Sequence, residues 1–154
     1  MIENVKKLQQ NGHTVIFNTT LSLYTIFDYT DLIEFLDKEF PGCLIHGQFA
    51  DNIWPFVFNY SLEQISKLER IKHTNIYKNN TLFKSFVNGV INFAKSSKLD
   101  QPKLSKFFSY NDRLDKSRNS CLNNYIPELE HLRPLIGGTH GTNSTKDVAS
   151  CKKT

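Results

Sequence analysis

The side chains that could bind a ligand in this chain alternate along two short runs rich in β-branched and aromatic residues. The runs are residues 13–27, HTVIFNTTLSLYTIF, and residues 43–50, CLIHGQFA. Their alternating polar members are Asn18, Thr20, Ser22, His46 and Gln48. Because successive side chains of a strand point to opposite faces, each run predicts a strand with one polar face. Amide, hydroxyl and imidazole groups there could line a barrel or cleft, or could face solvent near a sheet edge.

Helical patterns precede and follow the first run. Apolar residues at helical spacing predict a helix over residues 2–11 and a second between Asp28 or Thr30 and Pro41. The order is therefore helix, strand, helix, strand. Connections of this length join parallel strands by a right-handed crossover, which favours an α/β fold with an open or partial barrel.

The rest of the chain divides into an aromatic connector, several helices and a polar tail. We expect an irregular packed segment over residues 51–60, a capping box at Ser61 and Gln64, and an amphipathic helix over residues 79–95. Pro102 suits the first turn of a helix, and two polar helical stretches follow. These stretches are residues 110–119 and 125–132. We assign residues 1–95 to the α/β part, 96–135 to a helical extension and 136–154 to a disordered tail.

Composition argues against a disulfide-rich or membrane-spanning protein and leaves contact with nucleic acid open. The formal charge of +4 and pI near 8.9 permit contact with nucleic acid, although we see no dense basic stripe. Cys43, Cys121 and Cys151 are too far apart to predict a disulfide framework or a metal site, and we expect buried thiols. No run approaches the ~18 apolar residues that span a membrane, so we expect a cytoplasmic protein.

No spacing of residues predicts a catalytic triad, a carboxylate pair or a phosphate-binding glycine loop. The segment RLDKSRN has basic residues, Arg113, Lys116 and Arg118, that could bind phosphate. The alternative is a solvated helix face on which Asp112 and Asp115 pair with these residues.

Four stretches resemble the C-terminal half of radical S-adenosylmethionine proteins of phage and bacterial type. They are VIFNTTLSLYTIFDYTDLIEFLDKEF, WPFVFNYSLEQISKLERI, LDKSRN and YIPEL. In that family a partial TIM-like barrel precedes a small twitch or SPASM extension. The resemblance covers roughly residues 2 to 135 and implies half of a partial α/β barrel followed by a helical extension.

The family's signature, Cys-x3-Cys-x2-Cys, is absent from this sequence. In the family those cysteines hold a [4Fe-4S] cluster whose open iron binds S-adenosylmethionine. The resemblance therefore implies a truncated or split protein, inactive alone, whose partner is a separately encoded N-terminal half. It assigns contacts with the cofactor or substrate to Asn18, Thr20 and Ser22, and more weakly to His46 and Gln48. The alternative is a small viral or mobile-element accessory protein that binds a protein or nucleic-acid partner through its basic late helices.

Overall fold

The computed structural model describes residues 2–50 and 54–133. The chain divides into two compact units, Met1–Leu99 and Asp100–Thr154. The boundary predicted from the sequence, between residues 95 and 96, lies four residues earlier. The predicted disordered tail, residues 136–154, lies outside the described residues. Each unit is considered by itself.

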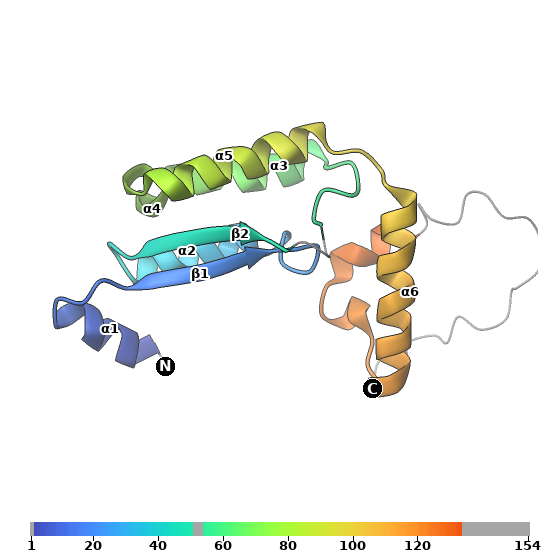
Figure 1. Ribbon diagram of the computed structural model, residues 1–154, viewed down its shortest axis with the longest axis horizontal. Coiled ribbons are helices and arrows are strands. Elements are labelled where there is room, and N and C mark those ends of the chain that lie inside the picture. The colour runs from blue at the N-terminus through green and yellow to red at the C-terminus, as the bar shows by residue number, and fades with distance from the viewer. Residues whose placement is uncertain (1, 51–53, 134–154) are drawn as a thin grey trace, which may run out of the picture. The chain divides into compact units, whose positions relative to one another are not determined.

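The first unit is built on a strand–helix–strand segment (Figure 1). Strand β1 (Ile16–Leu21) leads into helix α2 (Tyr29–Glu39) and then into strand β2 (Leu44–Phe49). The two strands are parallel, with Ile16 opposite Leu44 and Leu21 opposite Phe49. The predicted α/β order and parallel pairing are confirmed. The sheet has only these two strands within the described residues, so the fold is helical with a small parallel sheet.

Strand β1 is shorter than the predicted strand over residues 13–27, and that prediction is wrong beyond Leu21. The reason is local hydrogen bonding by hydroxyl side chains. The Ser22 N–H donates to Thr25 Oγ1 at 2.9 Å, and the Tyr24 N–H donates to Ser22 Oγ at 3.2 Å. Such bonds compete with a sheet ladder, so the chain turns here instead of extending.

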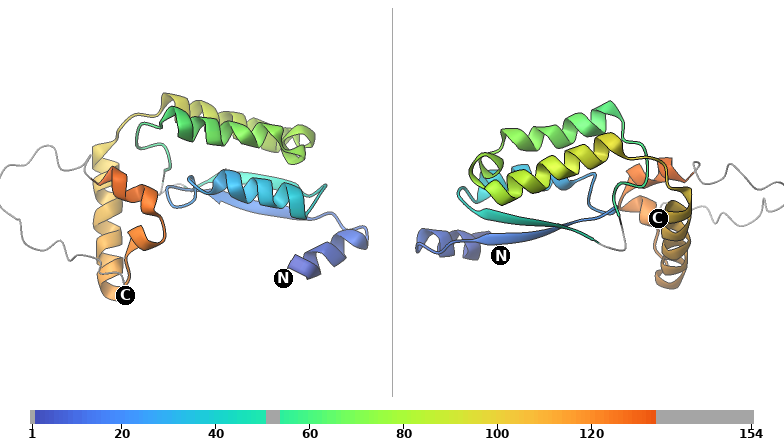
Figure 2. Two further views of the ribbon diagram at one scale, coloured as in Figure 1. Left: turned by 180° about the vertical axis from the view of Figure 1, so that it is seen from behind. Right: turned by 45° about the horizontal axis from the view of Figure 1, so that its top comes forward.

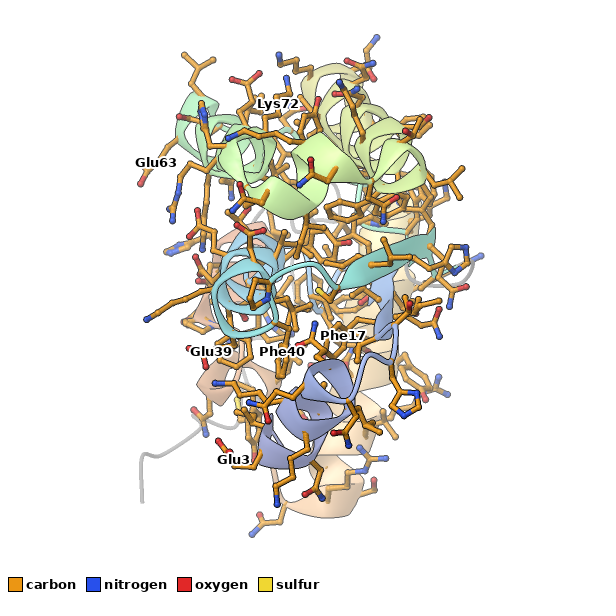
Figure 3. All side chains as sticks on the ribbon, turned by 90° about the vertical axis from the view of Figure 1, so that its left-hand side faces the viewer. Glu3, Phe17, Glu39, Phe40, Glu63 and Lys72 are labelled. Atoms are coloured by element: carbon orange, nitrogen blue, oxygen red, sulfur yellow. The ribbon has the colours of Figure 1, made fainter. Side chains whose placement is uncertain are left out.

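Helix α1 (Ile2–Gln10) precedes the sheet and contacts the C-terminal end of α2. Lys6 Nζ donates to Glu39 Oε2 at 2.7 Å. The rings of Phe17 and Phe40, labelled in Figure 3, lie 5.1 Å apart with their planes tilted by 47°. The first contact joins α1 to the end of α2, and the second joins β1 to the residue that caps α2.

Helices α3 (Leu62–Glu69) and α5 (Thr81–Ser96) lie side by side, as the right-hand view of Figure 2 shows. The predicted capping box opens α3, with the Gln64 N–H donating to Ser61 Oγ and Ser61 N–H donating to Gln64 Oε1. The short helix α4 (Asn75–Asn79) comes between them, so the predicted helix over residues 79–95 begins two residues late.

The described part of the aromatic connector, residues 54–60, is mostly buried, as its composition predicts, and residues 51–53 lie outside the described residues. Residues 55–58 are all buried, and Trp54 and Phe56 pack with Phe49 and Phe93 at centroid distances of 5.1 to 5.9 Å. Edge-to-face and tilted ring pairs of this kind fix a segment that has no regular secondary structure. The connector therefore belongs to the core of the first unit.

In its described part, residues 100–133, the second unit consists of one long helix and two short 3-10 helices. Helix α6 (Gln101–Arg118) is continuous and includes most of the stretch predicted over residues 110–119. Pro102 lies in its first turn as predicted, and the Asp100 side chain accepts a hydrogen bond from the Lys103 N–H. The 3-10 helices η2 (Leu122–Asn124) and η3 (Pro127–Leu132) follow.

Candidate functional site

Four of the five candidate residues lie together on one exposed face of the sheet. Asn18 is opposite His46 and Thr20 is opposite Gln48, and all four side chains are exposed. Gln48 Nε2 donates to Thr20 Oγ1 across the strands at 3.0 Å. We call this surface, with Ile16 and Leu44 at its start, the open face. Its groups are neutral hydrogen-bond donors and acceptors.

Ser22 does not join the open face. It lies beyond the last residue of β1, and only 7% of its surface is exposed. Its hydroxyl accepts a hydrogen bond from the Tyr24 N–H and contacts Thr25 Oγ1. The alternation expected from the sequence stops at Leu21 because these bonds begin a turn.

The opposite face of the sheet is packed against helices. Thr19, Leu21 and Ile45 are buried there. The Thr19 hydroxyl bonds the hydroxyl of Tyr29 from α2 at 2.9 Å. Burial raises the pKa of Tyr29 to about 12, although the hydrogen bond with Thr19 lowers it.

Gly47 allows α5 to pack closely on this inner face. A Cβ atom at Gly47 would lie 2.5 Å from two ring carbons of Phe86 in α5. The Phe86 ring also lies 4.9 Å from the ring of Phe49, the last residue of β2. The Phe86 ring thus covers the inner face, and it can do so only because residue 47 is a glycine. The polar residues lie on the opposite face.

The open face is unusual for a parallel sheet. Parallel sheets are ordinarily covered on both sides, because crossover helices lie on each face. Here Ile16 and Leu44, which pair at the start of the strands, are 57% and 39% exposed. Two apolar and four polar side chains therefore form a surface that no described element covers.

Both edges of the sheet also carry backbone groups that pair with no strand of the described residues. Leu44 N–H donates to Val15 O and Ala50 N–H donates to Leu21 O. In a parallel ladder with this register, the N–H and C=O groups of the even-numbered residues of β1 point away from β2. Among those carbonyls, Thr20 O accepts a hydrogen bond from Thr25 Oγ1 at 3.1 Å. On β2, Asn80 Nδ2 donates to Ile45 O at 3.1 Å.

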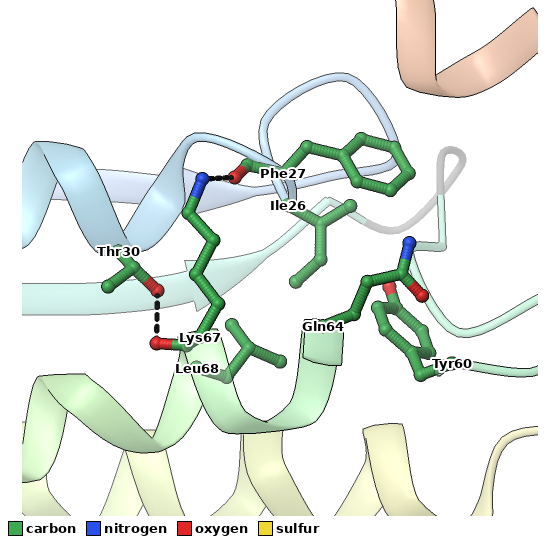
Figure 4. Close-up of a pocket in the computed structure, with 7 residues that line it drawn as sticks. All are labelled: Ile26, Phe27, Thr30, Tyr60, Gln64, Lys67 and Leu68. Atoms are coloured by element: carbon green, nitrogen blue, oxygen red, sulfur yellow. Dashed lines mark hydrogen bonds between the residues drawn. The ribbon is translucent and has the colours of Figure 1, made fainter. Parts of the chain in front are cut away.

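A small cavity lies away from the open face, between α2 and α3 (Figure 4). Its volume of about 30 Å³ suits one or two water molecules and excludes an organic ligand. Lys67 closes one side, because its Nζ donates to Phe27 O at 2.8 Å and pairs with Asp31 at 2.8 Å. No local pattern predicts this role for Lys67, since its partners Asp31 and Phe27 are 36 and 40 residues away in the chain. We assign this cavity to packing.

The cysteines and acidic residues do not assemble a metal site in the described residues, where no three His, Cys, Asp or Glu side chains come together. Cys43 and Cys121 are buried, and Cys151 lies outside the described residues. Burial raises the pKa of the Cys43 thiol to about 11, and Asp37 adds to the rise. Cys43 is therefore protonated at neutral pH and is a poor ligand.

The predicted ion pairs within α6 are wrong. Asp112 accepts hydrogen bonds from the guanidinium of Arg133 at 2.7 and 3.2 Å. Asp115 accepts from the Ser120 hydroxyl and from the Leu122 N–H. Both carboxylates hold the segment after α6 in place, so neither neutralises the basic residues of the helix.

Comparisons of the chain with protein-family models, curated proteins and solved structures found no match. Within residues 2–50 and 54–133, none of the helices combines the length and the apolar character needed to cross a membrane.

Proposed function

We propose that this chain supplies one wall of a larger α/β protein of the radical S-adenosylmethionine type. In this proposal, β1, α2 and β2 form part of a partial TIM-like barrel, and α6 with the two 3-10 helices forms the extension after it. Further polypeptide, encoded in the same gene or separately, contributes the remaining strands. The chain alone is inactive.

The observation that carries the proposal is the open face on a parallel strand pair. A parallel pair with one bare side and outward-turned backbone groups has the features of an incomplete sheet. Asn18 and His46 sit side by side on the bare side, next to Thr20 and Gln48. Polar residues on the open face are suited to hydrogen-bond a polar ligand once further strands enclose them.

The residues present suit S-adenosylmethionine better than they suit an iron–sulfur cluster. Amide, imidazole and hydroxyl groups at these four positions match the ribose hydroxyls and the charged ends of the cofactor's methionine part. The cluster has no such match, because Cys43 is buried with a raised pKa and the described residues hold no group of three ligands. We therefore assign cluster binding to the other polypeptide, and this chain takes no part in the reaction at the cluster.

The coding sequence around this chain provides the first test. We expect an in-frame or neighbouring segment that encodes Cys-x3-Cys-x2-Cys. Its absence would contradict the proposal. Anaerobic treatment of this chain alone with iron and sulfide should give no stoichiometric [4Fe-4S] absorbance, and a stable cluster would likewise count against it.

Titration calorimetry with S-adenosylmethionine on the two co-expressed polypeptides provides the second test. Asn18→Ala and His46→Ala should each weaken binding roughly five-fold, the effect of losing about 1 kcal/mol of hydrogen bonding. The matched control is Asn79→Ala, at an exposed position of α4, which should leave the affinity unchanged. Equal affinities for all three variants and the original complex would remove the open face from the cofactor site.

A further inference from the structure

We propose that one exposed side of α6 binds single-stranded nucleic acid through its phosphates and one stacked base. The residues of this side, which we call the basic stripe, are Lys106, Tyr110, Arg113 and Lys116. They are three or four positions apart, so they follow one side of the helix. All four are exposed, whereas Leu104 and Phe108 on the other side are buried.

Within residues 2–50 and 54–133, no carboxylate forms an ion pair with the cations of the basic stripe, although the charge of Lys106 contributes to lowering the pKa of Asp100. Of the carboxylates in the described residues, none lies within 4.0 Å of the charged groups of Lys106, Arg113 or Lys116. The two acids nearest in sequence, Asp112 and Asp115, are held by groups that follow α6. Three positive charges are therefore free to neutralise phosphates, and releasing their counterions would favour binding.

Tyr110 gives the stripe its preference for nucleic acid. Its side chain is 51% exposed and lies between Lys106 and Arg113 along the stripe. Proteins that bind single strands combine backbone-neutralising cations with aromatic rings on which bases stack. A membrane-binding helix needs a broad apolar face beside its cations, and an acidic protein partner needs apolar anchors. The stripe offers neither, because Ser109 and Ser117 beside it are exposed and polar, and Phe107 and Leu114, which flank Tyr110, are partly buried.

The length of the basic stripe matches a short stretch of single-stranded nucleic acid. Ten residues separate Lys106 from Lys116, which is about 15 Å along the helix. At roughly 3.4 Å per phosphate of a stacked strand, this length covers about four phosphates. The proposal rests on the second unit alone and does not depend on the function proposed for the sheet.

Fluorescence anisotropy with the full chain and a fluorescein-labelled 20-nucleotide oligo(dT), at several KCl concentrations, tests the proposal. Lys106→Gln combined with Lys116→Gln should reduce the slope of log affinity against log salt by about 1.4, since each single-strand phosphate contact contributes about 0.7. Tyr110→Ala should weaken binding roughly 5- to 150-fold, as expected for loss of one stacked base, and Tyr110→Phe should restore it.

The matched control replaces two exposed lysines of the first unit, Lys7→Gln and Lys78→Gln, and so removes the same charge elsewhere. Its slope should equal that of the original chain. The proposal is overturned if both double variants reduce the salt slope equally. It is also overturned if the original chain does not bind the oligonucleotide at 50 mM KCl, or if Tyr110→Ala leaves the affinity unchanged. Stripe-dependent binding to phosphatidylglycerol vesicles or polyglutamate without binding to the oligonucleotide would also overturn it, in favour of another class of partner.

Discussion

Replacing Gly47 by alanine tests which face of the sheet is packed. The added Cβ would lie 2.5 Å from two carbons of the Phe86 ring, closer than real Cβ contacts come. Either the ring or helix α5 must move. Because Phe86 also contacts the rings of Tyr29, Phe49 and Phe83, its movement disturbs the packing between α5, α2 and β2.

Overpacking of this kind costs roughly 1 to 3 kcal/mol of unfolding free energy. We expect Gly47→Ala to fall in the upper half of that range, since the clash is with the body of a ring held by three neighbours. Urea unfolding followed by circular dichroism measures the loss as a lower midpoint at an unchanged slope. In a Phe86→Ala background the ring is gone, so adding Gly47→Ala should then cost less than about 0.5 kcal/mol.

The matched control is Gly89→Ala in the same helix that carries Phe86. No atom lies within 4 Å of a Cβ built at Gly89, so alanine should stabilise the chain by about 0.5 to 1 kcal/mol through its better helix propensity. The reasoning fails if Gly47→Ala costs less than about 0.5 kcal/mol in the original chain. It also fails if the cost is the same with and without the Phe86 ring.

Two further predictions concern groups that hold the first unit together. Stability should fall by about 2 kcal/mol more in the original chain than in Tyr29→Phe as pH rises from about 10 to 12. The raised pKa of Tyr29, about 12, keeps its phenol protonated in the folded state while the unfolded state ionises. Equal pH dependence in both proteins, measured by urea unfolding, would contradict this. Asn80→Ala should cost about 1 to 2 kcal/mol, because Asn80 both caps α5 by accepting from the Phe83 N–H and donates to Ile45 O. The neighbouring Asn79→Ala should stay within about 0.5 kcal/mol, and similar losses at both positions would refute a specific role for Asn80.

The parts of the fold that follow from short-range pattern were predictable from the sequence. Alternation placed Asn18, Thr20, His46 and Gln48 on one face, and the helix between the two runs required a parallel pair. The Ser61 cap was predictable for the same reason, since its partner Gln64 is three residues away. Each of these depends on neighbours within one element or one crossover.

The parts that depend on competition or on distant partners were not predictable. The end of β1 was missed because Ser22 and Thr25 offer the backbone other hydrogen bonds, which hydrophobic alternation does not record. The basic residues of α6 were paired with Asp112 on spacing alone, whereas Arg133, 21 residues further along, takes that carboxylate. Alternation also cannot distinguish a polar lumen from a polar face in solvent, because both need the same residues.

Residue-resolved amide hydrogen exchange along β1 tests the incomplete sheet most directly. In this chain alone, the Phe17 and Thr19 amides point toward β2 and should exchange slowly, while the Ile16 and Asn18 amides point to the free edge and should exchange rapidly. Co-expression with the polypeptide that carries Cys-x3-Cys-x2-Cys should slow the Ile16 and Asn18 amides at least roughly ten-fold, to rates near those of their neighbours, as expected when a strand pairs with that edge. Unchanged exchange at Ile16 and Asn18 in the complex, or slow exchange of all four amides in the isolated chain, would contradict the claim that this sheet is completed by another strand.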